Sequence, residues 1–180
     1  ELWRDIRAAA ESGWDFSSRW FADPRALTSI RTTRLVPVDL NALLFGLEQA
    51  ISKAASGLGE NDLSYDFAAR AERRGRAVAA HLWNPLGGHY ADFDLDSGRV
   101  SDRLTAAAAF PLFAGIASAA QGRSTAVALE RLLRPGGLMT TLSENGQQWD
   151  VPNGWAPLQW IAIIGLRRYD EMTLADEIAE

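Results

Sequence analysis

The most informative stretch of the chain is the segment Gln148-Trp149-Asp150-Val151-Pro152-Asn153-Gly154-Trp155-Ala156-Pro157. It alternates planar rings with amide groups and an acid, and its two prolines stiffen the backbone. Ligand pockets combine aromatic walls with a few well-placed polar groups, so the segment suits a sugar-binding loop. The same residues also suit a rigid loop whose two tryptophans fill the core. The residues alone leave both interpretations open.

Helical periodicity dominates the rest of the chain. Residues 157–169, directly after this segment, are apolar nearly all round and predict a buried helix. The 3.6-residue period predicts further helices over residues 1–11, 39–57, 61–84, 105–120, 124–134 and 174–180. Strict alternation around residues 88–98 predicts a hairpin that closes at residues 96–98. The sequence therefore predicts an all-α fold of antiparallel helix pairs with one short β-hairpin.

Local signals refine the helices. Asp39 is the candidate N-cap of the helix that follows it. Leu40, Leu43 and Leu47 continue the helical period and mark an apolar stripe on that helix. Pro111 should kink or break the helix in which it lies, because proline has no N–H donor.

The composition of the chain excludes several classes of function. The 180 residues suffice for one hydrophobic core, and 47% hydrophobic residues argue against disorder. The net charge of −5 argues against a nucleic-acid partner. No apolar run approaches the roughly 20 residues that span a bilayer, so no membrane partner is expected. The absence of cysteine excludes disulfides and thiolate metal sites.

Metal and cofactor sites have little support. Asp92, Asp94 and Asp96 resemble the start of a calcium loop, but the glycine and the final glutamate of that loop are missing. We interpret the three aspartates as the solvated face of the hairpin. His81 and His89 lack a second ligand at metal spacing, and no glycine-rich phosphate loop is present. We therefore expect no metal ion and no cofactor.

A second candidate site lies in residues 12–20, in a loop directly after the first predicted helix. Asp15 stands there between two aromatic residues, and apolar surroundings favour the protonated form of a carboxyl group. A general acid needs its proton near neutral pH. Gly13 would let the backbone approach a ligand closely. The alternative is that Asp15 caps the helix or pairs with Arg19 to fix the loop.

Both segments resemble the trehalases, the inverting glycoside hydrolases that cleave α,α-trehalose. Residues 148–157 match every fixed position of the family signature Gln-Trp-Asp-x-Pro-x-(Gly/Ala/Val)-Trp-(Pro/Ala/Ser)-Pro. Residues 12–20 also look like the family, as do residues 29–33 and 37–41. The resemblance extends over essentially the whole chain.

The resemblance implies part of an (α/α)6 toroid, in which loops at one rim form the sugar pocket. The acid of the family's Ser-Gly-Trp-Asp motif is the general acid, and it falls on Asp15. The substrate-binding residues implied in this sequence are Gly13, Gln148, Trp149, Asp150, Asn153 and Trp155. Among these, Asp150 and Gln148 are expected to orient the pocket and not to react. The implied ligand is trehalose or its product glucose.

Trehalases are much longer than this chain, and their general base is a glutamate that would follow residue 180. We therefore expect residues 1–180 to be a single segment of the catalytic domain, without its N-terminal half and C-terminal end. In isolation the segment should be inactive, and it should pack on the remainder of the trehalase chain or self-associate. The expected compartment is the periplasm, with the cytoplasm as the alternative.

Two other functions stay open at this point. The first is a non-catalytic helical module that binds sugar or a protein partner through the aromatic loop. The second is a toroid glycosidase for a different disaccharide. Trehalose binding without glucose release would favour the first, and a panel of substrates would separate the second.

Overall fold

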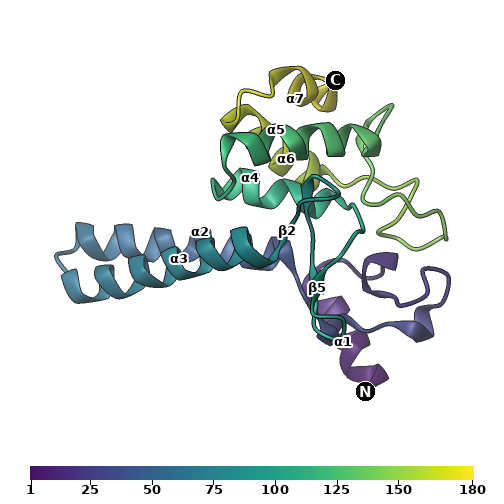
Figure 1. Ribbon diagram of the computed structural model, residues 1–180, viewed down its shortest axis with the longest axis horizontal. Coiled ribbons are helices and arrows are strands. Elements are labelled where there is room, and N and C mark those ends of the chain that lie inside the picture. Colours follow the sequence, from purple (N-terminus) through teal and green to yellow (C-terminus); the bar gives the residue numbers. More distant parts are fainter.

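A long helical arm projects from the rest of the molecule in the computed structural model, which describes residues 1–180 (Figure 1). The α-helices are α1 (Leu2–Ser12), α2 (Val38–Gly57), α3 (Asn61–His81), α4 (Phe110–Ala114), α5 (Ala119–Leu129), α6 (Ala156–Arg168) and α7 (Met172–Ala179). Short 3-10 helices are η1 (Ser18–Trp20), η2 (Leu27–Ser29), η3 (Thr32–Arg34), η4 (Ala106–Ala109) and η5 (Glu130–Leu132). The antiparallel pair α2 and α3 forms the arm, and the other helices form the body (Figure 1). The mainly helical fold confirms the predicted class.

Small sheets are more numerous than the one hairpin predicted. The strands are β1 (Leu35–Val36), β2 (Trp83–Asn84), β3 (His89–Tyr90), β4 (Phe93–Asp94), β5 (Arg99–Val100), β6 (Leu133–Arg134) and β7 (Gly137–Leu138). β4 and β5 form the predicted hairpin, and β1 pairs with the other edge of β4. β2 pairs with β3 and β6 with β7, all antiparallel. Strands of two residues are too short to show alternation in a sequence, which explains the difference.

The predicted helix over residues 105–120 is divided in the structure. Pro111 lies in the first turn of α4, where its missing N–H costs no helical hydrogen bond. The break comes instead at Gly115, whose φ of 75° ends α4 in the left-handed conformation. α5 begins after Ser118, which forms a capping box with Gln121. The next predicted helix therefore starts earlier than its sequence pattern indicated.

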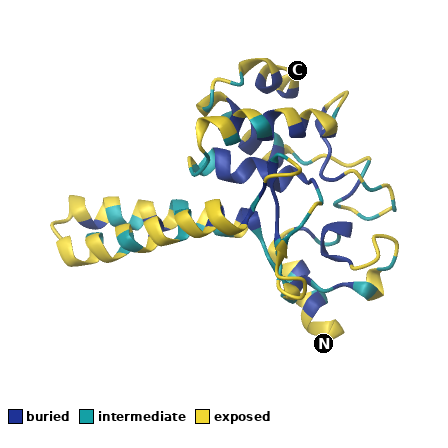
Figure 2. Cartoon of the chain, viewed as in Figure 1, coloured by how far each residue is buried: buried dark blue, intermediate teal, exposed yellow.

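The leucine stripe of α2 faces solvent. Leu40, Leu43 and Leu47 are 51%, 48% and 55% exposed. α3 packs against α2, and Gly75 of α3 leaves room for the ring of Phe45. A Cβ atom at Gly75 would lie only 3.0 Å from that ring. Most of the arm is exposed (Figure 2), so the periodicity predicted the helix but not whether residues 1–180 cover its apolar face.

The core of the body forms where α4 and α6 pack together. Gly165 permits this contact, because a Cβ atom there would lie 2.9 Å from the backbone nitrogen of Phe113. Leu112 and Leu166 are completely buried in this region. α6 is less buried than predicted, since Trp160 is 56% exposed.

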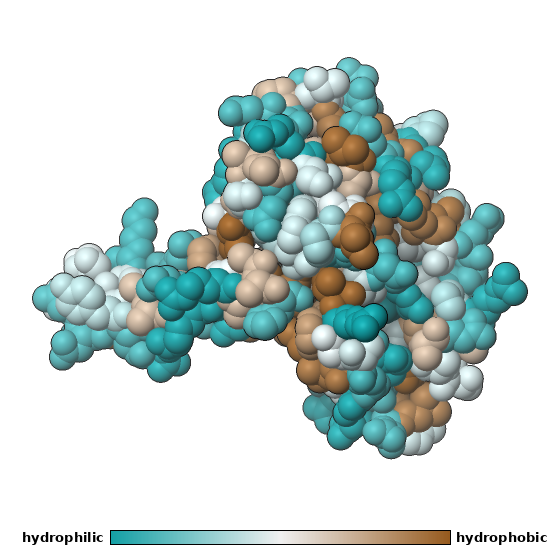
Figure 3. Space-filling model, in the orientation of Figure 1, coloured by the Kyte–Doolittle hydropathy of each residue, from teal (hydrophilic) through white to brown (hydrophobic).

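Hydrophobic residues gather on the body near the root of the arm, whereas the far end of the arm is mostly hydrophilic (Figure 3). None of the helices has both the length and the apolar character needed to cross a bilayer.

Candidate active site

The two candidate segments of the sequence lie against each other in the structure. The ring of Trp14 stacks on Trp149, with centroids 5.1 Å apart, and Trp149 stacks on Trp155 at 4.7 Å. The backbone N–H of Trp149 also donates a hydrogen bond of 3.0 Å to the carbonyl of Phe16. These contacts build one wall of three indole rings. Trp149 lies between the other two rings and Trp14 is only 3% exposed, so Trp155 is the ring of the three that keeps an outer face on which a sugar ring can pack.

Asp15 lies between the two residues that make these contacts, and its peptide bond to Phe16 is cis. Gly13, with φ of 79°, is the C-cap of α1, and a Cβ atom there would meet nothing within 4 Å. The Asp15 side chain is half-buried and forms no hydrogen bond or ion pair with any protein group. Asp15 therefore neither caps the helix nor pairs with Arg19, and its carboxyl group is free to meet a ligand.

Arg19 is fully committed to two other carboxylates. Its Nη1 and Nη2 atoms donate to Asp39, and its Nε and Nη2 atoms donate to Asp92, each at 2.7 Å. The guanidinium lies over the rings of Trp14 and Trp20, 4.5 and 4.3 Å from their centroids. Only 1% of the Arg19 side chain is exposed. Arg19 thus joins the aromatic wall to α2 and to the start of β4.

This pairing corrects two predictions. Asp39 is not the N-cap of α2, because Pro37 occupies that position and the Asp39 side chain turns to Arg19. Asp92 is not on a solvated face, since it is only 7% exposed. In addition to Arg19, Asp92 accepts a hydrogen bond of 2.9 Å from the N–H of Val38. The local pattern could not reveal this, because the partner is distant in sequence.

Burial and Arg19 act on Asp39 in opposite directions. Burial disfavours the charged carboxylate, but the charge and hydrogen bonds of Arg19 outweigh it and lower the pKa of Asp39 below its usual range. Burial likewise works to lower the pKa of Arg19, and the two carboxylates overcome it and raise that pKa. Arg19 and Asp39 are therefore both charged at neutral pH, and Asp92 accepts hydrogen bonds from the same guanidinium.

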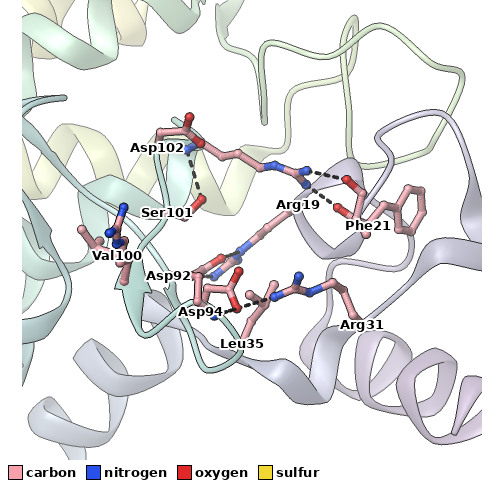
Figure 4. Close-up of a pocket in the computed structure, with 13 residues that line it drawn as sticks. Arg19, Phe21, Arg31, Leu35, Asp92, Asp94, Val100, Ser101 and Asp102 are labelled. Atoms are coloured by element: carbon pink, nitrogen blue, oxygen red, sulfur yellow. Dashed lines mark hydrogen bonds and ion pairs between the residues drawn. The ribbon is translucent and has the colours of Figure 1, made fainter.

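A polar cavity of about 410 Å³ opens beside the Arg19–Asp92 pair (Figure 4). Across it Arg31 points toward Asp94, with which it forms an ion pair (Figure 4). The cavity is lined by neither Asp15 nor the stacked tryptophans. Because two of its arginines are already paired with aspartates and the aromatic wall lies outside it, we do not place the sugar site there.

Asp150 supports the wall from within the protein and does not face solvent. Its carboxylate is completely buried. Oδ1 accepts hydrogen bonds from the hydroxyls of Ser17, Ser18 and Thr141 at 3.0, 2.9 and 2.6 Å. Oδ2 accepts one from the N–H of Ser18 at 2.7 Å. The prediction that Asp150 is among the residues that contact the substrate is therefore corrected, because no face of it is accessible to a ligand.

The remaining predicted residues keep polar groups available. Gln148 and Asn153 are exposed, and the side chain of Gln148 forms no hydrogen bond within the protein. The carbonyl of Asn153 is used by Thr140, whose N–H donates at 3.1 Å and whose hydroxyl donates at 2.8 Å. The indole N–H of Trp155 is buried and has no acceptor in the protein. The amide of Gln148 is thus free at the edge of the aromatic wall, whereas the N–H of Trp155 is enclosed by the protein.

Sequence reasoning missed the buried supports of this site, Asp39, Asp92 and Thr141. One signal was available, since an arginine placed between two tryptophans in a buried loop needs carboxylate partners. Which carboxylates serve it depends on tertiary contacts that no local pattern encodes.

Two solved structures with a similar fold are sugar-cleaving enzymes. The neutral trehalase of Saccharomyces cerevisiae matches 99% of the chain and 35% of its own length, with a TM-score of 0.84 and 26% identity. The GH63 mannosylglycerate hydrolase of Thermus thermophilus, in complex with glucose, matches 95% of the chain and 50% of its own length, with a TM-score of 0.79 and 25% identity. The fold is thus that of part of an (α/α)6 toroid, as in these two enzymes.

Sequence comparison gives the family. The Trehalase family matches residues 1–180. The periplasmic trehalase of Xanthomonas campestris pv. campestris (strain B100) is 54% identical over 181 residues, which cover 100% of this chain and 32% of that protein. The periplasmic trehalase of Pseudomonas aeruginosa is 55% identical over 179 residues, covering 99% of this chain and 33% of that protein. The chain belongs to the trehalase family and spans about a third of the length of these relatives.

Proposed function

We propose that this chain supplies the proton-donating part of a periplasmic enzyme that hydrolyses trehalose to two glucose molecules with inversion. The observation that carries the proposal is Asp15, a carboxyl group without protein partners beside a wall of three stacked tryptophans. Trehalose is favoured over mannosylglycerate, because the relatives named periplasmic trehalase are 54–55% identical and the Thermus enzyme is only 25% identical.

In the proposed reaction Asp15 protonates the oxygen that bridges the two glucose rings. Inversion needs a second carboxylate roughly 6.5–9.5 Å from the first, with a water molecule between it and the anomeric carbon. The buried carboxylates near Asp15 are all committed, since Asp39 and Asp92 hold Arg19 and Asp150 is saturated with hydrogen bonds. We therefore infer that the general base comes from another part of the enzyme, and that residues 1–180 form one segment of its catalytic domain.

The residues around Asp15 would hold the sugar. Trp155, at the end of the stack, presents the ring against which a glucose unit packs, and Trp149 supports it from behind. The amide of Gln148, which no protein group uses, is available to the hydroxyls of the glucose unit. Gly13 leaves the backbone open on the other side of the acid. Asn153 lies at the exposed edge of the same loop.

A chimera tests the function. Residues 1–180 would replace the matching segment of the Xanthomonas campestris periplasmic trehalase, and the product is called the Xanthomonas chimera below. We expect it to release glucose from trehalose, with an initial product of inverted configuration detectable by NMR, and to leave mannosylglycerate intact. A folded chimera that cleaves mannosylglycerate but not trehalose would contradict the proposed substrate.

The isolated 180-residue chain is expected to bind trehalose weakly and to release no glucose, because it lacks the base. Its exposed leucines on α2 should also cause self-association, which light scattering would detect. A monomer that turns over trehalose would contradict this prediction. In that case Asp15→Asn and Glu144→Gln would be the first variants to measure.

A further inference from the structure

We propose that Asp150 is a positioning residue that fixes the loop carrying Asp15. This inference rests on the proposed function and assigns to Asp150 a role that needs no contact with sugar. The carboxylate of Asp150 is completely buried, and no arginine or lysine nitrogen lies within 4.0 Å of it. Four donors satisfy it, of which three are hydroxyls and one is a backbone N–H.

The contacts surround Asp15 without including it. Trp14 stacks on Trp149, and the carbonyl of Phe16 accepts the N–H of Trp149. Ser17 and Ser18 then donate to Asp150. Consequently, residues 14 and 16–18 all contact residues 149–150, by ring stacking or by hydrogen bonds. Only the Asp15 side chain is left unattached within this stretch, which is the arrangement expected of a group presented to a ligand.

Thr141 connects the same carboxylate to the core. Its hydroxyl donates to Oδ1 of Asp150 at 2.6 Å, and its backbone forms an isolated antiparallel bridge with Thr105. Thr105 caps η4, whose alanines are completely or almost completely buried. Asp150 therefore links the loop of Asp15 to the buried core of the body. A displacement of this carboxylate would move the acid relative to the aromatic wall.

The chemistry of the site requires a carboxylate in particular. All four groups around Asp150 act as hydrogen-bond donors, so both oxygens must be acceptors. An asparagine has the same shape, but its amide nitrogen would face either the N–H of Ser18 or the three hydroxyls. In the first orientation a donor opposes a donor. In the second the three hydroxyls must turn round to accept, and the amide nitrogen has only two hydrogens to give them. Asp150→Asn should therefore shift the loop that carries Asp15 without leaving a cavity in the core.

The test is the Asp150→Asn variant of the Xanthomonas chimera. We expect kcat for trehalose to fall about 10²-fold, the effect of a misplacement near 1 Å, with KM nearly unchanged because the tryptophan wall remains. α-Glucosyl fluoride gives a second readout, because fluoride leaves with little help from a proton donor. If Asp150 acts through Asp15, hydrolysis of the fluoride should fall much less than hydrolysis of trehalose.

Controls separate this inference from the proposed function. Asp15→Asn in the same chimera must lose activity on trehalose; if it does not, the proposed function fails whatever Asp150 does. Asp62→Asn, a change at an exposed carboxylate of α3, should leave both rates unchanged.

If Asp150→Asn does not fold, Thr141→Val and Thr141→Ser replace it, and only the variant that keeps the hydroxyl should retain full kcat. An Asp150→Asn rate on trehalose close to that of the parent, or equal losses on both substrates, would overturn the inference, as would equal kcat values for the two Thr141 variants.

Discussion

The Asp15→Asn variant of the Xanthomonas chimera should hydrolyse trehalose about 10²–10⁴-fold more slowly than its parent, the usual contribution of a general acid. Asparagine keeps the size of the side chain but has no acidic proton to give to the bridging oxygen. KM should change little, because the tryptophan wall and the free amide of Gln148 stay in place. Steady-state glucose release at several trehalose concentrations measures both quantities.

The matched control for this variant is Asp23→Asn. Asp23 lies in the same long loop, is exposed, and its carboxylate accepts only a local hydrogen bond from the N–H of Arg25. Its substitution should leave kcat for trehalose unchanged. An Asp15→Asn rate within a few-fold of the parent would show that another group supplies the proton, and the site would need to be reassigned.

The largest effect on stability is expected from Arg19→Met. Removing one partner of a buried ion cluster leaves uncompensated charge, which costs about 3–5 kcal/mol of unfolding free energy. Asp39 and Asp92 would both lose Arg19, and Trp14 would lose the cation on its face. Urea unfolding of the chimera, followed by tryptophan fluorescence, should show a lower midpoint.

Acid pH provides an independent check on this cluster. The folded-state pKa of Asp39 is lowered, so its contribution to stability is present above the unfolded pKa of about 3.9 and is lost as pH falls through the folded value. The parent should therefore lose stability as pH decreases below ~4, and Arg19→Met should lose less over the same range. Arg7→Met serves as the control, because Arg7 is an exposed arginine paired only with Glu11. Equal unfolding midpoints for Arg19→Met and Arg7→Met would contradict the assigned role.

Long helices were the most predictable part of this fold. α3 and α6 follow from apolar spacing and from the turn residues that bound them. The division at Gly115 and the start of α5 were missed, because a capping box at Ser118 lies within a run of alanines that also suits a continuous helix. The exposed leucines of α2 were unpredictable for another reason. Periodicity records an apolar face, but it does not record which segment covers that face.

For the site too, the sequence motifs were predictable, whereas the contacts between distant segments were not. The motifs around Asp15 and Trp155 were visible in the sequence, and the structure brings their two segments together. The resemblance implied that Asp150 orients the pocket, but the sequence could not show whether this acid also contacts the sugar or is buried behind the site. Only its burial and its bonds to Ser17 and Thr141 distinguish the two.

The most direct test is a crystal structure of the inactive Asp15→Asn chimera with trehalose bound. Our account predicts that the side chain at position 15 lies within hydrogen-bond distance, about 2.6–3.2 Å, of the bridging oxygen of the sugar. We also expect one glucose ring to pack on Trp155, the outer ring of this wall. Trehalose bound away from this wall, or a bridging oxygen beyond the reach of residue 15, would contradict the assignment of Asp15 as the proton donor.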